Sequence, residues 1–169
     1  MAEGPVEMNL GLITGLETPT DILKLAYGME QNLANFYREI EKKSSDDDLT
    51  ELLNTLASVE EQHTQYVYSL YKSGEINPLS LEDFQKAVKS DVIESGLKLD
   101  DFLNTNRDFL KTASDLLDLS MMLETQALDL YLRLAQRSTK EESRSAFHKI
   151  ADEEKTHLIS LSKLRDRRS

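Results

Sequence analysis

Residues 60–63 read Glu-Glu-Gln-His, and residues 154–157 read Glu-Lys-Thr-His. Both stretches place a histidine three positions after a glutamate, which puts the two side chains on one face of a helix, about one turn apart. One helix can therefore present a carboxylate and an imidazole to the same point. A single pair of this kind is weak evidence of a site, so its meaning depends on what recurs around it.

The two stretches belong to a longer repeat. An ungapped offset of 94 residues also superimposes Glu30 on Glu124 and Tyr37 on Tyr131. A solvated helix face has no reason to repeat such residues in register, and internal repeats indicate repeated structural units. Further positions follow the same offset: Asp21 and Asp115, Leu23 and Leu117, Leu25 and Leu119, Ala57 and Ala151, and Leu70 and Leu164.

Four stretches carry apolar residues at spacings of three and four, the pattern of amphipathic helices. These stripes run from Ile22 to Ile40, from Leu49 to Leu70, from Leu116 to Leu134 and from Phe147 to Leu164. We therefore predict an all-α protein, a four-helix bundle made of two repeated helical hairpins. The hairpins are expected over 20–74 and 106–166, joined by a long crossover over 75–105.

Capping signals predict where the helices begin and end. Thr20 is the expected N-cap of the first helix, which ends near Lys43. Ser44 or Ser45 is expected to cap the second helix, and Gly74 is expected to follow directly after its end. In the crossover, Ser80 begins a short helix and Gly96 interrupts the chain again. The third helix begins at Asn106 or at Ser114, and Thr139 with Glu142 forms a capping-box pattern before the fourth.

Residues 1–18 differ from the rest of the chain. Gly4, Pro5, Gly11 and Gly15 disfavour a helix there, and Pro19 is expected to break any helix at its end. Apolar residues between them indicate that the segment packs against something: Leu10, Leu12, Ile13 and Leu16. We interpret 1–18 as a lead-in or as a linker from an upstream domain, and 19–169 as one domain.

The composition excludes several classes of function. The chain has 169 residues, no cysteine and a net charge of −11. Without cysteine there is no disulfide, no thiolate metal site and no Cys-x-x-Cys redox pair, which agrees with a cytoplasmic location. The acidic balance disfavours nucleic acid as a partner, because phosphate binding needs a basic surface. No apolar run approaches the roughly 18 residues of a membrane span, and the N-terminus lacks the basic start of a signal peptide.

The repeated glutamates and histidines interrupt the apolar stripes, so we expect them to point into the bundle. Burying a lone carboxylate costs on the order of several kcal/mol, so these groups need protons or cations. Two divalent ions balance four glutamates, and oxygen-rich ligation with one nitrogen per ion suits iron or manganese. The candidate metal ligands are Glu30, Glu60, His63, Glu124, Glu154 and His157.

Other polar residues near this set receive different interpretations. Tyr37 and Tyr131 each lie seven residues after a candidate glutamate, where a hydroxyl can orient a ligating carboxylate; the alternative is a core aromatic ring with a satisfied hydroxyl. Glu61 and Glu153 do not follow the repeat, and we expect surface ion pairs for them. His148 has no repeat partner and is expected to be exposed.

These residues resemble the ferritin-like superfamily and, within it, the rubrerythrin family, over about residues 20–166. The resemblance rests on Glu30 with Tyr37, residues 60–63, Glu124 with Tyr131, and residues 154–157. It implies a non-haem centre of two iron ions per chain that reacts with peroxide or dioxygen. It also implies that Glu60 and Glu154 bridge the ions, that the other four ligands are terminal, and that the protein is a homodimer.

The chain departs from the family pattern at two points. Rubrerythrins usually end in a rubredoxin domain with four cysteines that delivers electrons, whereas this chain has no cysteine. We therefore expect an external electron-donor protein. Rubrerythrins also carry an extra glutamate one turn after the ligand of the third helix, where this chain has Ala127. That glutamate is linked to efficient peroxidase turnover, so its absence favours a more symmetric, ferritin-like or oxidase-like site.

We predict a di-iron oxidoreductase that reduces peroxide or dioxygen. Two alternatives remain open at this point. One is an iron-handling or ferroxidase-type protein without peroxidase turnover. The other is a structural or interaction module with a vestigial metal site.

Overall fold

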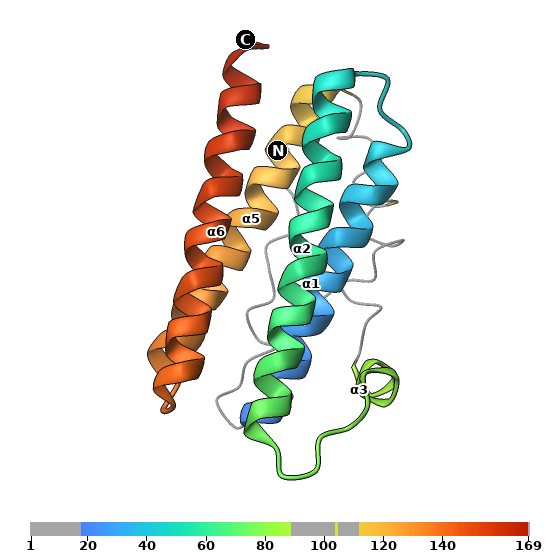
Figure 1. Ribbon diagram of the computed structural model, residues 1–169. Helices are drawn as coiled ribbons and strands as arrows, with labels where there is room; N and C mark the ends of the chain where they lie inside the picture. Colours follow the sequence, from blue (N-terminus) through green and yellow to red (C-terminus); the bar gives the residue numbers. More distant parts are fainter. Residues whose placement is uncertain (1–17, 89–103, 105–111, 169) are drawn as a thin grey trace.

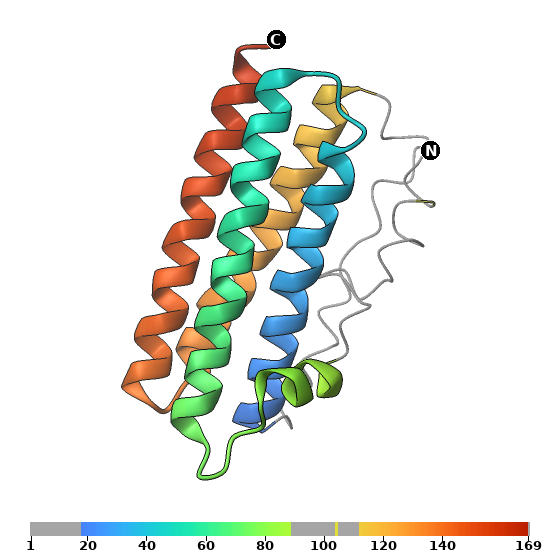
Figure 2. The same cartoon turned by 45° about the vertical axis from the view of Figure 1, so that its right-hand side comes forward.

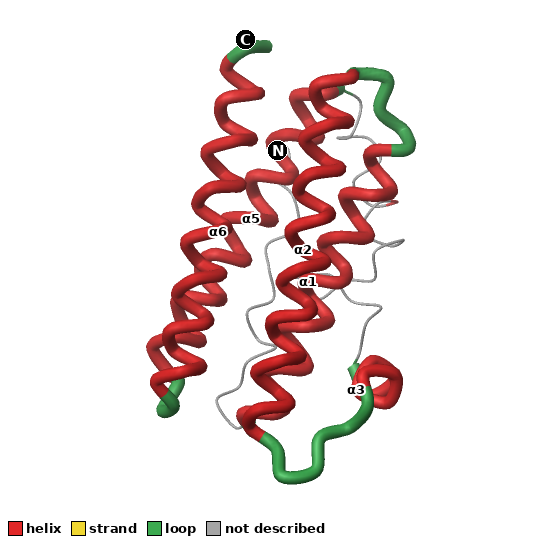
Figure 3. Tube along the Cα trace, viewed as in Figure 1, coloured by secondary structure: helices red, strands yellow, loops and turns green. Residues whose placement is uncertain are grey.

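The computed structural model describes residues 18–88, 104 and 112–168. Within these residues the chain forms helices and no strand (Figure 3). The helices are α1 (Pro19–Glu41), α2 (Asp47–Gly74), α3 (Leu81–Ala87), α5 (Ala113–Arg137) and α6 (Glu141–Asp166). The lead-in up to Glu17, Gly96 and Asn106 lie outside the described residues.

The four long helices lie side by side as a bundle (Figures 1 and 2). Helices α1 and α2 form one antiparallel hairpin, and α5 and α6 form the other. Helix α2 ends at one end of the bundle and α5 begins at the opposite end, so the connection between the hairpins joins opposite ends of the bundle. The predicted all-α bundle of two hairpins, with its ferritin-like crossover, is confirmed.

The first helix of each hairpin begins with a capping box. The Thr18 hydroxyl accepts from the backbone N–H of Asp21, and the Asp21 carboxylate accepts from the backbone N–H of Thr18, both at 3.1 Å. Thr112 and Asp115 make the same pair of bonds. The prediction of Thr20 as N-cap was wrong, because Pro19 does not break the helix but occupies its first position, where no N–H is needed.

Three other predicted ends were also displaced. Asp46, rather than Ser44 or Ser45, caps α2, since its carboxylate accepts from Leu49 N–H at 3.0 Å. Gly74 is the last residue of α2 rather than the residue after it. The predicted box of Thr139 and Glu142 does not form, because α6 begins at Glu141 and its N-cap position falls on Lys140. The short helix α3 is capped by Ser80, as predicted.

Helix α3 closes one end of the first hairpin. Its buried Phe84 contacts the rings of Tyr27, edge-on at 5.2 Å between centroids, and of Tyr71 at 4.4 Å. Gln85 donates to the Tyr27 hydroxyl at 2.7 Å. These contacts bind the start of the crossover to α1 and α2.

The core consists of two apolar clusters separated along the bundle axis. One cluster contains Met29, Val67, Leu130 and Ile150 among others. The other contains Leu33, Leu56, Leu123 and Leu161 among others. On each long helix the buried glutamates and histidines fall between the two clusters, so a polar layer divides the core at mid-height.

Candidate metal centre

The structure brings all six predicted ligands together in this polar layer. Glu30 comes from α1 and Glu124 from α5, while α2 and α6 each supply a glutamate and the histidine one turn later. The four glutamates are 0 % exposed, and His63 and His157 are 2 % and 5 % exposed. A group of ionisable residues this deeply buried requires compensating charge.

The six residues form two overlapping sets of possible ligand atoms. One set is Glu30, Glu60, His63 and Glu154, and the other is Glu60, Glu124, Glu154 and His157. Within each set the ligand atoms all lie within 4.8 Å of one another. Glu60 and Glu154 belong to both sets, so each of them could serve both members of a pair of ions.

Each histidine presents its Nδ1 atom to three carboxylates. His63 Nδ1 lies 2.9 Å from Glu60, 3.3 Å from Glu30 and 3.3 Å from Glu154. His157 Nδ1 lies 3.1 Å from Glu60, 3.2 Å from Glu124 and 3.3 Å from Glu154. One nitrogen with three carboxylate oxygens is a donor set that suits iron or manganese.

The central carboxylates lack hydrogen-bond donors. A ring nitrogen carries at most one hydrogen, and the hydrogen bonds of the two Nδ1 atoms go to Glu30 and Glu124. Both oxygens of Glu60 and both oxygens of Glu154 are buried without a hydrogen-bond partner. Buried polar atoms are rarely left in this state, and two bridging carboxylates would use all four oxygens on metal ions. The residues present therefore fit a pair of divalent ions.

Two buried tyrosines hold the outer carboxylates. The Tyr37 hydroxyl donates to Glu124, and the Tyr131 hydroxyl donates to Glu30. Each bond joins α1 to α5, so each tyrosine serves the glutamate of the other hairpin and not the one seven residues before it on its own helix. Burial, followed by the charge of Glu124, raises the pKa of Tyr37 well above its usual value, so this hydroxyl keeps its proton and remains a donor.

The carboxyl groups divide into two kinds. Burial raises the pKa of Glu30 to about 8 and that of Glu124 well above its usual value. Burial acts on Glu60 in the same direction, but contacts with His157 and His63 outweigh it and lower the pKa of Glu60. The pKa of Glu154 is also lowered, because contacts with Glu124 and His157 outweigh the effect of burial.

The histidines complete the charge balance. Burial by itself lowers the pKa of an imidazole, but contacts with carboxylates outweigh it, raising the pKa of His157 to about 12 and that of His63 far above its usual value. In the metal-free protein at neutral pH, two protonated imidazoles therefore balance two ionised carboxylates. Two divalent ions with four carboxylates and neutral imidazoles balance as well, so ions can replace protons without adding net charge to the layer.

Glu153, for which we expected a surface ion pair, also contacts the centre. Its Oε2 lies 2.7 Å from Nε2 of His63, the ring nitrogen that faces away from the cluster. No pattern indicated this contact, because Glu153 does not follow the repeat and its neighbour Glu154 does. Glu61 makes the expected surface ion pair, with Arg38 at 3.1 Å, and His148 is exposed as predicted.

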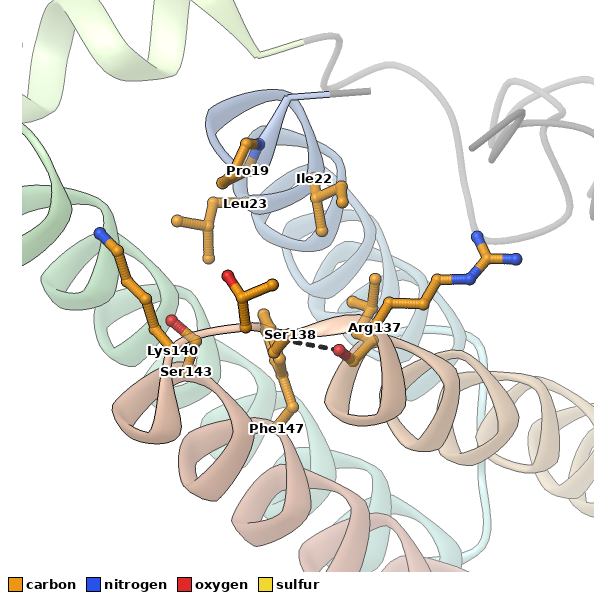
Figure 4. Close-up of a pocket in the computed structure, with 10 residues that line it drawn as sticks. Pro19, Ile22, Leu23, Arg137, Ser138, Lys140, Ser143 and Phe147 are labelled. Atoms are coloured by element: carbon orange, nitrogen blue, oxygen red, sulfur yellow. Dashed lines mark hydrogen bonds between the residues drawn. The ribbon is translucent and has the colours of Figure 1, made fainter. Parts of the chain in front are cut away.

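A pocket of about 370 Å³ lies at one end of the bundle, away from the six ligands. It opens between Pro19, Ile22 and Leu23 of α1 and the turn from α5 to α6 (Figure 4). Phe147 lines it and contacts the ring of Tyr131 at 6.0 Å between centroids. Phe147 thus connects the wall of this pocket to Tyr131, whose hydroxyl donates to Glu30.

Fold and site together define a class, the four-helix bundles whose buried carboxylates and histidines can hold metal ions. The family model named Rubrerythrin matches residues 21–165, and the chain belongs to the rubrerythrin family. None of the curated proteins and none of the solved structures compared with the chain matches it significantly. No helix in the described part of the chain is long and apolar enough to cross a membrane.

Proposed function

We propose that this protein binds two iron ions per chain and uses them to reduce peroxide or dioxygen. The observation that carries the proposal is the pair of overlapping ligand sets that share Glu60 and Glu154. In the proposed assignment these two glutamates bridge the ions, and Glu30, Glu124, His63 and His157 are terminal ligands. Manganese accepts the same donor atoms.

Two ferrous ions, once bound, would supply two electrons, one from each ion, which with two protons reduce one hydrogen peroxide to two waters. The chain supplies positions and a dry environment. Tyr37 and Tyr131 hold the terminal carboxylates, both imidazoles present Nδ1, and the apolar clusters above and below exclude bulk water.

The electrons that restore the ferrous state must come from elsewhere. The chain has no cysteine and hence no thiolate-bound redox centre of its own. The proposal therefore includes a separate electron-donor protein as a partner. A homodimer is the proposed assembly, and size-exclusion chromatography with light scattering measures it.

An anaerobic Fe(II) titration of the metal-free protein tests the site. We expect two tightly bound ions per chain, and one hydrogen peroxide consumed per two ions when the loaded protein is then mixed with peroxide. Glu154→Gln should bind fewer than two ions and lose the reaction, because a bridging carboxylate is removed. Glu61→Gln is the matched control, since it neutralises an exposed carboxylate paired with Arg38. Two ions and full activity in Glu154→Gln would refute the assignment.

Ala127 favours a second candidate, an iron-handling or ferroxidase-type protein. It is fully buried and occupies the position at which the rubrerythrin pattern has an additional glutamate, so the ligand set stays equal in the two hairpins. Stopped-flow oxidation of the ferrous protein separates the two candidates. Faster oxidation by peroxide than by dioxygen, with repeated turnover, supports the oxidoreductase, whereas oxidation by dioxygen with the iron retained supports iron handling.

A further inference from the structure

The six ligands obey the internal repeat, but the residues around the two histidines do not. Nε2 of His63 lies 2.7 Å from Oε2 of Glu153. Glu153 belongs to α6 and His63 to α2, so this contact joins the two hairpins at the edge of the metal centre. A carboxylate on the outer nitrogen of a metal-binding histidine is a common means of orienting that ligand.

Helix α2 offers no equivalent carboxylate to His157. The offset of 94 residues places Val59 at the position of Glu153, and both residues are partly buried. A valine side chain cannot accept a hydrogen bond. The two metal positions share Glu60 and Glu154, and each has an equivalent terminal glutamate and tyrosine. The contact of Glu153 with Nε2 of His63 distinguishes one position from the other.

The contact with Glu153 prepares His63 for metal binding. When a metal ion replaces the hydrogen on Nδ1, the atom that faces the three carboxylates, a carboxylate at Nε2 keeps the remaining hydrogen on that nitrogen and so favours binding through Nδ1. It also fixes the orientation of the ring. Glu153 is held in turn, because Lys149 Nζ lies 4.0 Å from its other oxygen and 5.0 Å from the centroid of the Tyr66 ring.

We propose that Glu153 is a positioning residue that makes the two metal positions unequal. The position of Glu30, Glu60, His63 and Glu154 binds a divalent ion first, and the position of Glu60, Glu124, Glu154 and His157 binds second. Loss of the hydrogen-bond partner of a metal-binding histidine typically weakens metal binding about 10- to 100-fold. We therefore expect the two positions to differ in affinity by about this factor. This inference rests on the metal pair of the proposed function and adds an order of filling to it.

The order is measurable with Zn(II), a diamagnetic divalent ion that accepts nitrogen and carboxylate ligands. The chain has three histidines, so ¹⁵N-labelled imidazoles give few NMR signals, and exposed His148 serves as the reference. We expect the first equivalent of Zn(II) to shift the Nδ1 signal of His63 and the second that of His157. Simultaneous shifts, or His157 first, would overturn the inference while leaving the proposed function intact. Binding of fewer than two ions would instead refute the metal pair itself.

Matched variants separate the role of Glu153 from a general effect on folding. Glu153→Val makes α6 resemble α2, and we expect it to weaken the first binding step about 10- to 100-fold and abolish the order. Val59→Glu supplies the missing carboxylate to His157. By itself it should reduce the difference in Zn(II) affinity between the two positions. Combined with Glu153→Val, it should reverse the order of filling. Asp152→Asn is the control, because this exposed neighbour pairs with Lys155 at 2.8 Å and not with the centre. An unchanged order in both Glu153→Val and Val59→Glu would refute the inference.

Discussion

Both histidines of the centre direct the same ring atom, Nδ1, at three carboxylates from three different helices. Each outer glutamate receives, in addition, a hydroxyl hydrogen from a tyrosine of the opposite hairpin. Every terminal carboxylate is thus held from two sides. The positions of the two terminal carboxylates therefore depend in part on tyrosine hydroxyls, which are not among the six candidate ligands.

Tyr37→Phe tests this dependence. The substitution keeps the ring in the core but removes the only tyrosine hydroxyl that donates to Glu124 among the described residues. We expect the Fe(II) affinity of the chain to fall about 10- to 100-fold, as for other partners of metal ligands, measured by anaerobic titration.

Tyr71→Phe is the control for this substitution. Tyr71 is also buried, but its hydroxyl accepts from Leu79 N–H at 3.1 Å near α3. This variant should lose about 1 kcal/mol of stability and retain its Fe(II) affinity. Equal affinities in the two variants would show that the hydroxyl of Tyr37 only fills the core.

Among whole elements, the four long helices differ in how they begin. The repeat relates Thr18 and Asp21 of α1 to Thr112 and Asp115 of α5, and both pairs form capping boxes. It also relates Asp46, the N-cap of α2, to Lys140, the N-cap of α6. Lys140 makes no side-chain capping bond, so the first turn of α6 lacks the acceptor that Asp46 provides to Leu49 N–H of α2.

Lys140→Asp should therefore stabilise the protein. The backbone of Lys140 is already extended, with φ −87° and ψ 127°, as an N-cap residue requires. An aspartate there can accept from an N–H of the first turn and face the positive end of the helix dipole, and we expect a gain of about 1 kcal/mol. Urea unfolding measures it, and Lys140→Ala separates the new cap from the lost lysine charge. A gain of the same size in Lys140→Ala would contradict the capping explanation.

On the scale of the whole molecule, the polar layer divides the apolar core in two. In the metal-free protein this layer stays neutral by holding protons that the unfolded chain releases at neutral pH. The pKa of Glu30 is raised by burial from 4.5 to about 8. Its contribution to stability is fully present below about pH 4.5 and is lost as the pH rises through about 8. The pKa values of His63 and His157 are also raised, so their contribution to stability likewise decreases as the pH rises above 6.5.

We therefore expect the unfolding free energy of the metal-free protein to fall between pH 5 and pH 8. Each proton held only by the folded state contributes a slope of up to about 1.4 kcal/mol per pH unit. The metal-loaded protein should behave in the opposite way, because ions compete with protons for the same atoms. Urea unfolding of both forms across this range measures the difference.

Glu30→Gln is the control for the pH dependence, since an amide takes up no proton in this range. In the metal-free variant, the unfolding free energy should fall less steeply with pH, because the one proton held by Glu30 no longer contributes to the slope. Metal-free stability that rises steadily between pH 5 and pH 8 in the parent chain would contradict the assigned protonation states.

Much of this arrangement was predictable from local patterns. The spacing of apolar residues predicted four long helices, and the offset of 94 residues predicted two equivalent hairpins and selected the six residues that meet in the polar layer. Helix ends were less predictable, because Pro19 fits the first turn of a helix as well as it breaks one, and because the turn before α6 shifts its N-cap position from Thr139 to Lys140.

The sequence by itself determined the bundle and the four glutamates and two histidines of the polar layer, because helix periodicity and an internal repeat are properties of positions along one chain. Only the tertiary structure decided which groups meet across helices. The Tyr37 hydroxyl donates to Glu124 and not to Glu30, and Glu153 contacts His63. The spacing of residues along the chain predicted neither contact. Such contacts depend on the relative rotation and axial shift of two helices, which the packing of the two apolar clusters determines and which no pattern within a single helix records.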